Sequence, residues 1–241
     1  MELKRVVITG IGAITPIGNT LDEFWTNLVD GVSGADMITQ FDASKFRTKF
    51  ACEVKNFDPT VYMDRKEARK IDRFTQFAIV ASDQAMIDAG LNKDNVNPDR
   101  TGVVLASGIG GLITFQHEVT EFAKGDGTPR FNPFFIPKMI LDIAAGQISM
   151  RHNLRGPNFS VVSACASSTN AIIAAYNLLQ LGKADIIVSG GSEAVISEAG
   201  VGGFNAMKAM SERNDDPKTA SRPYDKDRDG FIMGEGAGVV V

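Results

Sequence analysis

The sequence is poor in the residues that define several specialised protein classes. Its 241 residues include two cysteines, two histidines and one tryptophan. The two cysteines, Cys52 and Cys165, are too few for a disulfide-stapled scaffold, and free thiols are typical of the reducing cytoplasm. With 44% hydrophobic residues, the chain is long enough to bury a sizeable core. We therefore expect a cytoplasmic protein held together by a packed core rather than by cross-links.

Long apolar runs and an excess of basic charge are also missing. The N-terminal segment "MELKRVVITGIGAI" turns apolar over only a few residues before glycines interrupt it, which is too short for a signal peptide or a membrane span. The formal net charge is -4, which gives no reason to expect nucleic acid or an anionic membrane as a partner. An acidic partner would have to meet a local basic patch.

What the sequence does contain is an alternation of strand-like and helix-like segments. Apolar, β-branched runs predict strands over residues 5–10, 101–107, 158–165, 184–191 and 236–241. Of these, we expect residues 101–107, 158–165 and 184–191 to be buried. Helical spacing of apolar residues predicts helices over residues 19–31, 66–90, 111–125 and 167–182, the first capped by Asn19 or Thr20. This alternation predicts an α/β fold with a mostly parallel, mixed sheet and helices on both faces.

The segment "VVSACASSTNAIIAAYNLL" places Cys165 between a predicted strand and a predicted helix, with small residues on both sides. Small residues allow the tight turn that exposes a nucleophile at the end of a strand. The unpaired N–H groups at a helix N-terminus favour the thiolate and can stabilise an oxyanion. The sequence therefore predicts that Cys165 is a nucleophile, while position alone also allows a small buried cysteine that packs like alanine.

Two short motifs imitate known binding loops without completing them. In "DKDRDG" the aspartates Asp225, Asp227 and Asp229 fall where an EF-hand has its first calcium ligands. The bidentate glutamate of an EF-hand stands at the twelfth position, but here Glu235 is eleventh and a glycine is twelfth. In "TGIGAIT" Thr15 replaces the third glycine of a dinucleotide-binding loop. We therefore expect no metal and no cofactor.

Five motifs taken together carry a more specific signal. They are "VVSACASS", "SGGSEA", "GVGGFNAM", "LRGPN" and "SRPYDKDRDGFIMGEGAGVVV". In this order they resemble the N-terminal half of a β-ketoacyl-acyl-carrier-protein synthase of the bacterial type II kind, the condensing enzyme of fatty acid synthesis. The resemblance covers essentially the whole chain and implies a thiolase-like fold. It identifies residues 1–241 as the N-terminal ketosynthase domain, with the C-terminal half of the family fold absent.

The resemblance also implies a reaction. Cys165 would take an acyl group from acyl carrier protein as a thioester, and a carbanion from the decarboxylation of malonyl carrier protein would attack that thioester. The family's catalytic histidines and lysine lie in motifs like N-A-H-G-T and K-x-x-x-G-H, and neither occurs in this sequence. His117 and His152 match no catalytic position of the family. We therefore expect this chain alone to be inactive in condensation.

Other site residues are implied by position in the family pattern. Ile109 matches the residue that gates the acyl pocket, and Phe134 matches one near the acyl tunnel and the dimer contact, so a homodimer is expected. In this family a basic rim meets the acidic carrier protein, and the residues that match this rim here are Lys66, Arg69, Lys70, Arg130 and Lys208. Both apolar residues could also be plain core residues, and the basic residues could be a solvated surface.

Two other functions fit parts of the same pattern. One is a thiolase-fold relative with different chemistry, namely a polyketide-type ketosynthase or a chain-length factor. The presence of Cys165 argues against the chain-length factor. The other is a non-catalytic fragment that binds carrier protein or a second half-chain.

Overall fold

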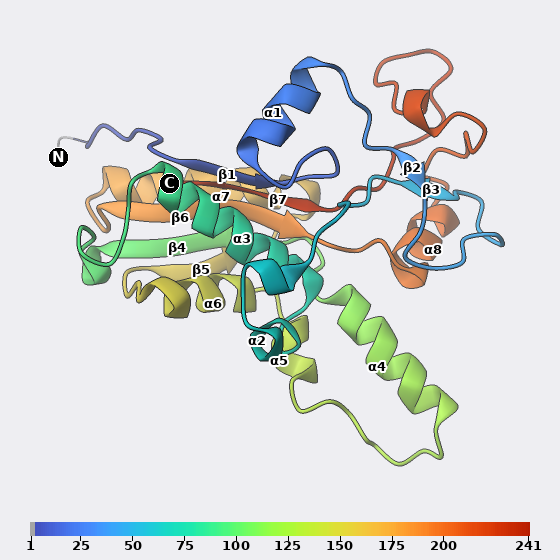
Figure 1. The fold of residues 1–241 in the computed structure, drawn as a ribbon, viewed down its shortest axis with the longest axis horizontal. Coiled ribbons are helices and arrows are strands. Elements are labelled where there is room, and N and C mark those ends of the chain that lie inside the picture. The colour runs from blue at the N-terminus through green and yellow to red at the C-terminus, as the bar shows by residue number, and fades with distance from the viewer. Residues whose placement is uncertain (1–2) are drawn as a thin grey trace.

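A single mixed β-sheet forms the centre of the molecule (Figure 1). The computed structural model describes residues 3–241. Five strands lie in the order β1-β7-β6-β4-β5, and a second sheet pairs β2 with β3. The strands are β1 (Ile11–Ile14), β2 (Asp36–Met37), β3 (Phe50–Ala51), β4 (Thr101–Ala106), β5 (Asn158–Val161), β6 (Ile186–Glu193) and β7 (Gly236–Val240). β6 pairs in parallel with β4, and β4 pairs in parallel with β5, whereas β7 runs antiparallel to both β6 and β1.

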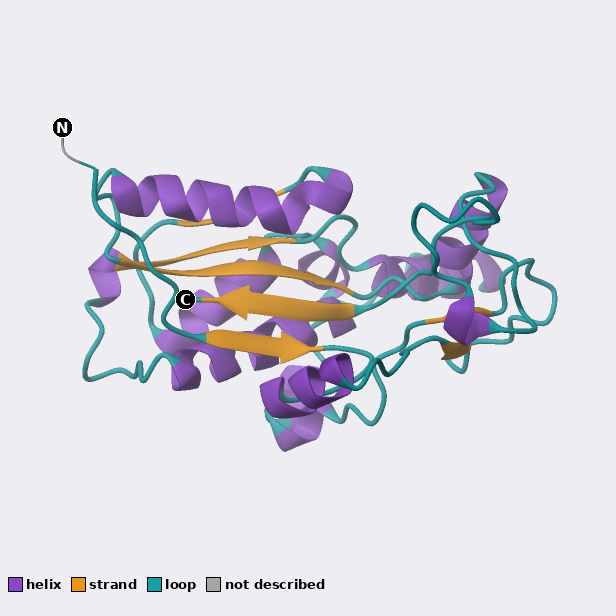
Figure 2. Ribbon diagram, turned by 90° about the horizontal axis from the view of Figure 1, so that it is seen from above, coloured by secondary structure: helices purple, strands orange, loops and turns teal. Residues whose placement is uncertain are grey.

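Helices cover both faces of this sheet, as the sequence predicted (Figures 1 and 2). The α-helices are α1 (Leu21–Val29), α2 (Arg65–Ala68), α3 (Arg73–Asp88), α4 (Leu112–Lys124), α5 (Phe135–Met139), α6 (Ile143–His152), α7 (Ser167–Gln180) and α8 (Glu198–Ala206). Four 3-10 helices are η1 (Pro59–Val61), η2 (Pro98–Arg100), η3 (Ala164–Ala166) and η4 (Pro217–Thr219). α3 and α6 pack on one face of the sheet, and α7 packs on the other.

The core is divided by the sheet into two layers of apolar side chains. On the α3 side, Phe74, Phe77 and Ile148 pack against Val103 and Val188 of the sheet. On the α7 side, smaller residues meet, among them Val104, Ala106, Ala171, Ala175 and Ile187. The small residues of α7 allow the helix to lie close to the strands, which fixes the position of its N-terminus.

Three predictions about elements need correction. The first strand covers residues 11–14 rather than 5–10, because β7, the strand beside it, pairs with residues 11–14. Beyond this pairing, the backbone of Val241 forms hydrogen bonds with Thr9 and Gly10. The strand at residues 158–161 is partly exposed rather than buried, because it lies at the edge of the sheet and pairs only with β4.

The third correction concerns the long helix expected over residues 66–90. It is split into α2 and α3, because Asp72 caps a new helix there. Its carboxylate accepts the N–H of Phe74 at 3.2 Å and also binds Thr114 of α4. A capped helix start with its own tertiary partner is more stable than a continuous helix that leaves this carboxylate buried without donors. The predicted Thr20 cap of α1 is confirmed, since its side chain accepts the N–H of Glu23.

A smaller lobe lies beyond one end of the sheet, formed by β2, β3, α8 and the loops before β7 (Figures 1 and 2). It has a core of its own, which includes Ala51, Ile196, Val201, Met210 and Met233. Within residues 3–241, none of the helices has the length and apolar character that crossing a membrane requires.

One face of α7 carries exposed apolar side chains. Ala171 and Ala175 face the sheet and are buried, whereas Ile173 is 50% exposed and Tyr176 is also exposed. A contiguous exposed apolar face promotes association.

We expect Ile173→Glu to weaken self-association of this chain, because the charge would have to be desolvated at the contact. Sedimentation velocity over a dilution series would measure the effect. Met150→Glu is the matched control, since Met150 is 66% exposed on α6, on the opposite side of the sheet. A wild-type chain that stays monomeric at every concentration would contradict this prediction.

Candidate active site

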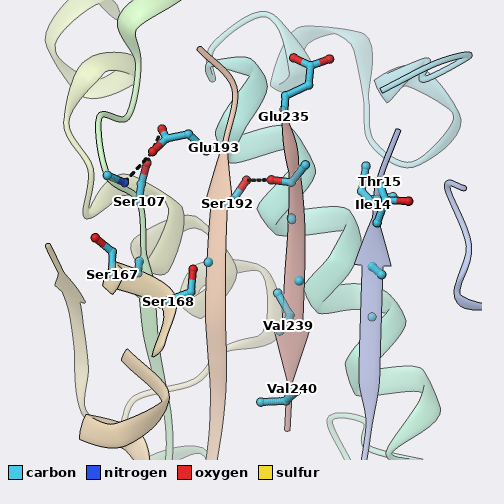
Figure 3. Close-up of a pocket in the computed structure, with 18 of the residues that line it drawn as sticks. Ile14, Thr15, Ser107, Ser167, Ser168, Ser192, Glu193, Glu235, Val239 and Val240 are labelled. Carbon is cyan, nitrogen blue, oxygen red and sulfur yellow. Dashed lines mark hydrogen bonds between the residues drawn. The ribbon is translucent and has the colours of Figure 1, made fainter. Parts of the chain in front are cut away.

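The strand ends that surround Cys165 meet at one edge of the sheet. Because β4, β5 and β6 are parallel, their carboxyl ends lie together there, next to the start of β7 and the end of β1. A hollow of about 740 Å³ opens at this edge and extends along β1 and β7, and its lining includes Cys165, Ser107, Gly108 and Glu193. Figure 3 shows the side chains of Ser107 and Glu193 directed toward each other above the ends of β4 and β6. The carboxyl end of a parallel sheet is the usual place for a site in α/β folds.

Cys165 lies on a tight bend that leads directly into α7. It is the middle residue of η3, and its side chain is exposed. Ala164, just before it, has φ 51°, a left-handed conformation that is costly for any residue with a Cβ. The predicted nucleophile elbow is therefore present in the backbone, with the strain at the residue before the cysteine.

Three polar side chains hold this bend in place. The Ser163 N–H donates to Ser167 Oγ at 2.8 Å, and Ser167 Oγ donates to the Ala164 carbonyl at 2.6 Å. Asn170 Nδ2 donates to Ser163 Oγ at 2.6 Å. These bonds compensate the strain at Ala164 and fix the Cys165 thiol at the N-terminus of a 14-residue helix. Backbone N–H groups in the first turn of a helix have no carbonyl partner within it, so they are available to a developing negative charge.

The start of α7 lies unusually close to β6. A Cβ atom added to Gly191 would lie 2.0 Å from Ser168 Oγ and 2.9 Å from Ser168 Cβ. Only glycine permits this approach. The "SGGSEA" motif thus has a physical role, since its second glycine lets α7, which follows Cys165, rest on the sheet.

Glu193, the last residue of β6, binds the loop that follows β4. Its carboxylate accepts hydrogen bonds from Ser107 Oγ at 2.9 Å and from the N–H groups of Gly108 at 2.7 Å, Ile109 at 3.0 Å and Gly110 at 3.1 Å. This contact was not predicted from the sequence. The signal available was a glycine-rich turn with free donors after one strand and an acidic residue at the end of another, but nothing in the sequence says that the two strands are neighbours.

A buried ion pair joins the start of α3 to the start of β7. The Glu235 carboxylate is fully buried and accepts Arg73 Nη2 at 2.7 Å and Nε at 3.1 Å, with further bonds from Val54 N and Gln40 Nε2. The Arg73 guanidinium also lies 4.6 Å from the Phe77 ring. Burial raises the pKa of Asp72, the neighbouring carboxyl, although hydrogen bonds from Thr114 oppose this shift.

This ion pair shows what Glu235, the glutamate of the EF-hand-like segment, binds in place of a calcium ion. Glu235 is the residue that falls one position short of the EF-hand glutamate, and it is paired with Arg73 instead. Asp229 accepts the N–H of Glu212 at 2.9 Å, and Arg213 donates to the Asp227 carbonyl at 3.0 Å. Across residues 3–241, no three His, Cys, Asp or Glu side chains are grouped so that they could hold a metal ion.

Neither histidine lines the hollow around Cys165. His152 ends α6, before β5, and its Nε2 lies 2.8 Å from Asp83 Oδ1. Cys165 follows β5, so the two residues are at opposite ends of that strand. His117 is exposed on α4 and lines a separate hollow with Gln40. Both histidines are therefore too remote to activate the thiol in this arrangement.

The two predicted acyl-pocket residues lie in different surroundings. Ile109 is exposed on the loop that Glu193 binds, and it does not line the hollow around Cys165. Phe134 precedes α5 and does not line this hollow, and its ring lies 5.3 Å from Lys70 Nζ. The proposed roles of both residues stay predictions.

The predicted basic rim falls into separate groups. Lys66 and Lys70 line one hollow together with Phe134, and the Arg69 carbonyl accepts Lys138 Nζ at 3.4 Å. Arg130 pairs with Asp126 at 3.4 Å on the exposed loop after α4. Another hollow brings together three basic side chains, those of Lys45, Arg47 and Lys208.

We expect iodoacetamide at limiting concentration to label Cys165 in preference to Cys52. Burial raises the pKa of the half-buried Cys52 thiol, so less of it is thiolate at neutral pH, whereas Cys165 is exposed. Peptide mass spectrometry of the folded protein measures the ratio, and Cys165→Ser gives the background from Cys52 alone. Equal labelling of both thiols would contradict the prediction.

We expect Gly191→Ala to destabilise the fold by about 1–3 kcal/mol and to slow the labelling of Cys165, because the new Cβ would push the start of α7 away from β6. Gly203→Ala is the matched control, since a Cβ on this α8 glycine meets nothing within 4 Å. Alanine favours the helix there, so its effect on stability should stay within about 1 kcal/mol and be favourable. Urea unfolding would measure both, and equal stability of the two variants would refute the packing argument.

Comparison with known proteins agrees with this geometry. Two curated relatives are both named 3-oxoacyl-acyl-carrier-protein synthase 2. One from Synechocystis sp. is 48% identical over 241 residues, and one from Staphylococcus aureus is 47% identical over 238 residues. The matches cover 100% and 99% of this chain but 58% and 57% of the relatives, so the chain spans somewhat more than half their length.

Solved structures show the same fold. A β-ketoacyl synthase from Burkholderia phymatum matches with a TM-score of 0.87 at 32% identity, over 100% of this chain and 58% of that one. A type II polyketide acyl-carrier protein in complex with its ketosynthase matches with a TM-score of 0.83 at 26% identity, over 99% of this chain and 58% of that one. The family model described as "Beta-ketoacyl synthase, N-terminal domain" matches residues 3–241. The chain therefore belongs to the β-ketoacyl synthase family and has the thiolase-like fold of its N-terminal domain.

Proposed function

We propose that this chain supplies the acyl-accepting part of a β-ketoacyl-acyl-carrier-protein synthase of fatty acid synthesis. The observation that carries the proposal is the exposed thiol of Cys165, held on a left-handed bend at the N-terminus of α7 and opening into the hollow at the end of the sheet. An exposed, fixed thiol at a helix N-terminus is suited to acyl transfer between thioesters.

In the first step, the Cys165 sulfur attacks the acyl carbonyl carbon of the carrier thioester. The new C–S bond forms, the old one breaks, and the carrier thiolate leaves and takes up a proton. The positive N-terminal end of α7 would stabilise the oxyanion that develops on the carbonyl oxygen. In the second step, the carbanion left when malonyl carrier protein loses carbon dioxide attacks the Cys165 thioester, and the thiolate is released.

The second step needs hydrogen-bond donors for the enolate that precedes carbon–carbon bond formation. The hollow around Cys165 is lined by no histidine, lysine or arginine side chain among residues 3–241. This chain alone should therefore accept an acyl group slowly and fail to decarboxylate malonyl carrier protein.

The relatives favour fatty acid synthesis over a polyketide pathway. The curated relatives at 47–48% identity carry the name 3-oxoacyl-acyl-carrier-protein synthase 2, whereas the polyketide ketosynthase structure is 26% identical. That structure holds a ketosynthase with its acyl-carrier protein, which supports an acyl carrier protein as partner here. Lys66 and Lys70 would receive its acidic surface, with Arg69, Arg130 and Lys208 extending the rim.

A homodimer and a cytoplasmic location belong to the same proposal. β5 is an edge strand with no neighbour on its outer side among residues 3–241, and Phe159 on it is exposed. Pairing with a second copy would satisfy the open backbone groups of this edge and cover the ring.

In the direct test, the chain is incubated with an acyl carrier protein whose acyl group is radioactive, and the radioactivity transferred to the chain is measured. We expect transfer to wild type and none to Cys165→Ser, since only the former carries the proposed nucleophile. Carbon dioxide release from malonyl carrier protein, measured in parallel, should stay at background. Acylation of the Cys165→Ser variant would disprove the proposed nucleophile, and sustained carbon dioxide release would show that the bases have been misplaced.

The same assay tests the basic rim. Lys66→Glu should slow transfer on the order of tenfold at low salt, because steering by opposite charge is lost, and added salt should reduce the difference. Lys93→Glu is the control, since Lys93 is exposed and follows the far end of α3, a helix about 24 Å long that begins after Lys66. Equal slowing by both variants would argue against a specific rim.

A further inference from the structure

The two edges of the five-stranded sheet are formed by β5, which pairs only with β4, and by β1, which pairs only with β7. In an antiparallel pair, the N–H groups of successive residues point alternately toward the partner strand and away from it. Gly10 accepts the Val241 N–H on the β7 side, so the N–H groups of Ile11 and Ala13 point away from β7. Free donors of this kind make an edge strand a template for pairing with another chain.

Side chains of α3 bind both of these outward donors. The Ile11 N–H donates to Asp88 Oδ2 at 2.9 Å. The Ala13 N–H donates to Gln84 Oε1 at 3.0 Å, and Gln84 Nε2 in turn donates to the Asn19 carbonyl at 2.7 Å. The spacings match, because four residues of a helix rise about 6 Å and two residues of a strand rise about 6–7 Å. α3 therefore offers β1 the acceptors that a neighbouring strand would offer.

Two glycines of the "TGIGAIT" segment bring α3 close enough for these bonds. A Cβ atom added to Gly10 would overlap the Ala85 carbonyl oxygen. One added to Gly12 would overlap the Ala81 carbonyl oxygen in the same way. A larger residue at either position would push the helix away from the strand. The segment that imitates a dinucleotide-binding loop thus serves the packing of a helix against an edge strand.

The position of Asp88 in α3 favours a role at the sheet edge over a role within the helix. Asp88 is the last residue of α3, and the last turn of this helix has no basic residue. A carboxylate at a helix C-terminus is repelled by the negative end of the helix dipole. Its bond to the Ile11 N–H offsets this repulsion, because hydrogen bonds to an ionised acceptor are stronger than neutral ones.

We propose that Gln84 and Asp88 take the place of a neighbouring strand and close the β1 edge to a strand from a second copy of the chain. The sheet is then open at β5 alone. A sheet with two open edges can grow into a long row of copies, whereas one open edge limits this growth to a pair. The inference goes beyond the proposed function and does not depend on the chemistry of Cys165.

The test compares assembly size by sedimentation velocity over a dilution series. The double variant Gln84→Ala with Asp88→Ala removes both acceptors and keeps residues that favour the helix. We expect it to form species larger than any that wild type forms at the same concentrations. At the lowest concentration, hydrogen exchange at Ile11 and Ala13 should be on the order of tenfold faster than in wild type, because a hydrogen bond is lost at each. It should slow again in the large species.

Asp88→Asn and Gln76→Ala are the matched controls. Asparagine keeps an oxygen that can accept the Ile11 N–H. Gln76 lies on the same helix, but its Nε2 donates to the Ala68 carbonyl of α2 at 3.0 Å. Both controls should sediment as wild type does. If the double variant does not fold, Asp88→Ala alone removes the exposed acceptor and should still quicken exchange at Ile11 and enlarge the assemblies.

A folded double variant that sediments like wild type would overturn the inference. Large species in which Ile11 and Ala13 exchange rapidly would do so as well, since the new contact would then lie on another surface. Equal growth in either control would also contradict the inference, because a loosened α3 or a lost charge would then explain the assembly without an open edge.

Discussion

The close contact between α7 and β6 at Gly191 is the constraint on which the site depends. It lets the helix start rest on the sheet, and the start of the helix carries Cys165. From there the position of the thiol follows from backbone geometry, because the left-handed Ala164 and the bonds among Ser163, Ser167 and Asn170 leave the bend little freedom. A side chain at Gly191 would separate the Cys165 thiol from the strands that supply the rest of the hollow.

Three carboxylates, of which Asp72 and Glu235 are buried and Glu193 is half-buried, then connect the elements around that helix. Asp72 joins α3 to α4, Glu235 joins β7 to α3 through Arg73, and Glu193 joins β6 to the loop after β4. Each one accepts several donors, which is the condition under which a buried charge is tolerated. None of the three pairs lies close in sequence, so these contacts hold the end of the sheet together across the chain.

The difference between local and long-range contacts decides what could be predicted from the sequence. The strand, small residues and helix around Cys165 are consecutive, so the elbow could be predicted, as could the Thr20 cap and the buried strand at residues 101–106. The exposed edge position of β5 and the shift of β1 depend on which strands become neighbours. Glu193 and Asp72 also bind partners that are distant in sequence. The loop donors that bind Glu193 are 83 or more residues away, and Thr114 is 42 residues from Asp72. Motif resemblance supplied the family, but it did not supply these contacts.

The acidic residues of the site also limit its chemistry. Only two carboxylates, Glu193 and Glu235, line the hollow within residues 3–241. Glu235 is ion-paired with Arg73, and Glu193 is bonded to four donors of the loop. These hydrogen bonds occupy the oxygens of both carboxylates, so the two groups hold the loop and the ion pair in place. The described residues thus place the Cys165 thiol in a hollow whose two carboxylates are already bound to other parts of the chain.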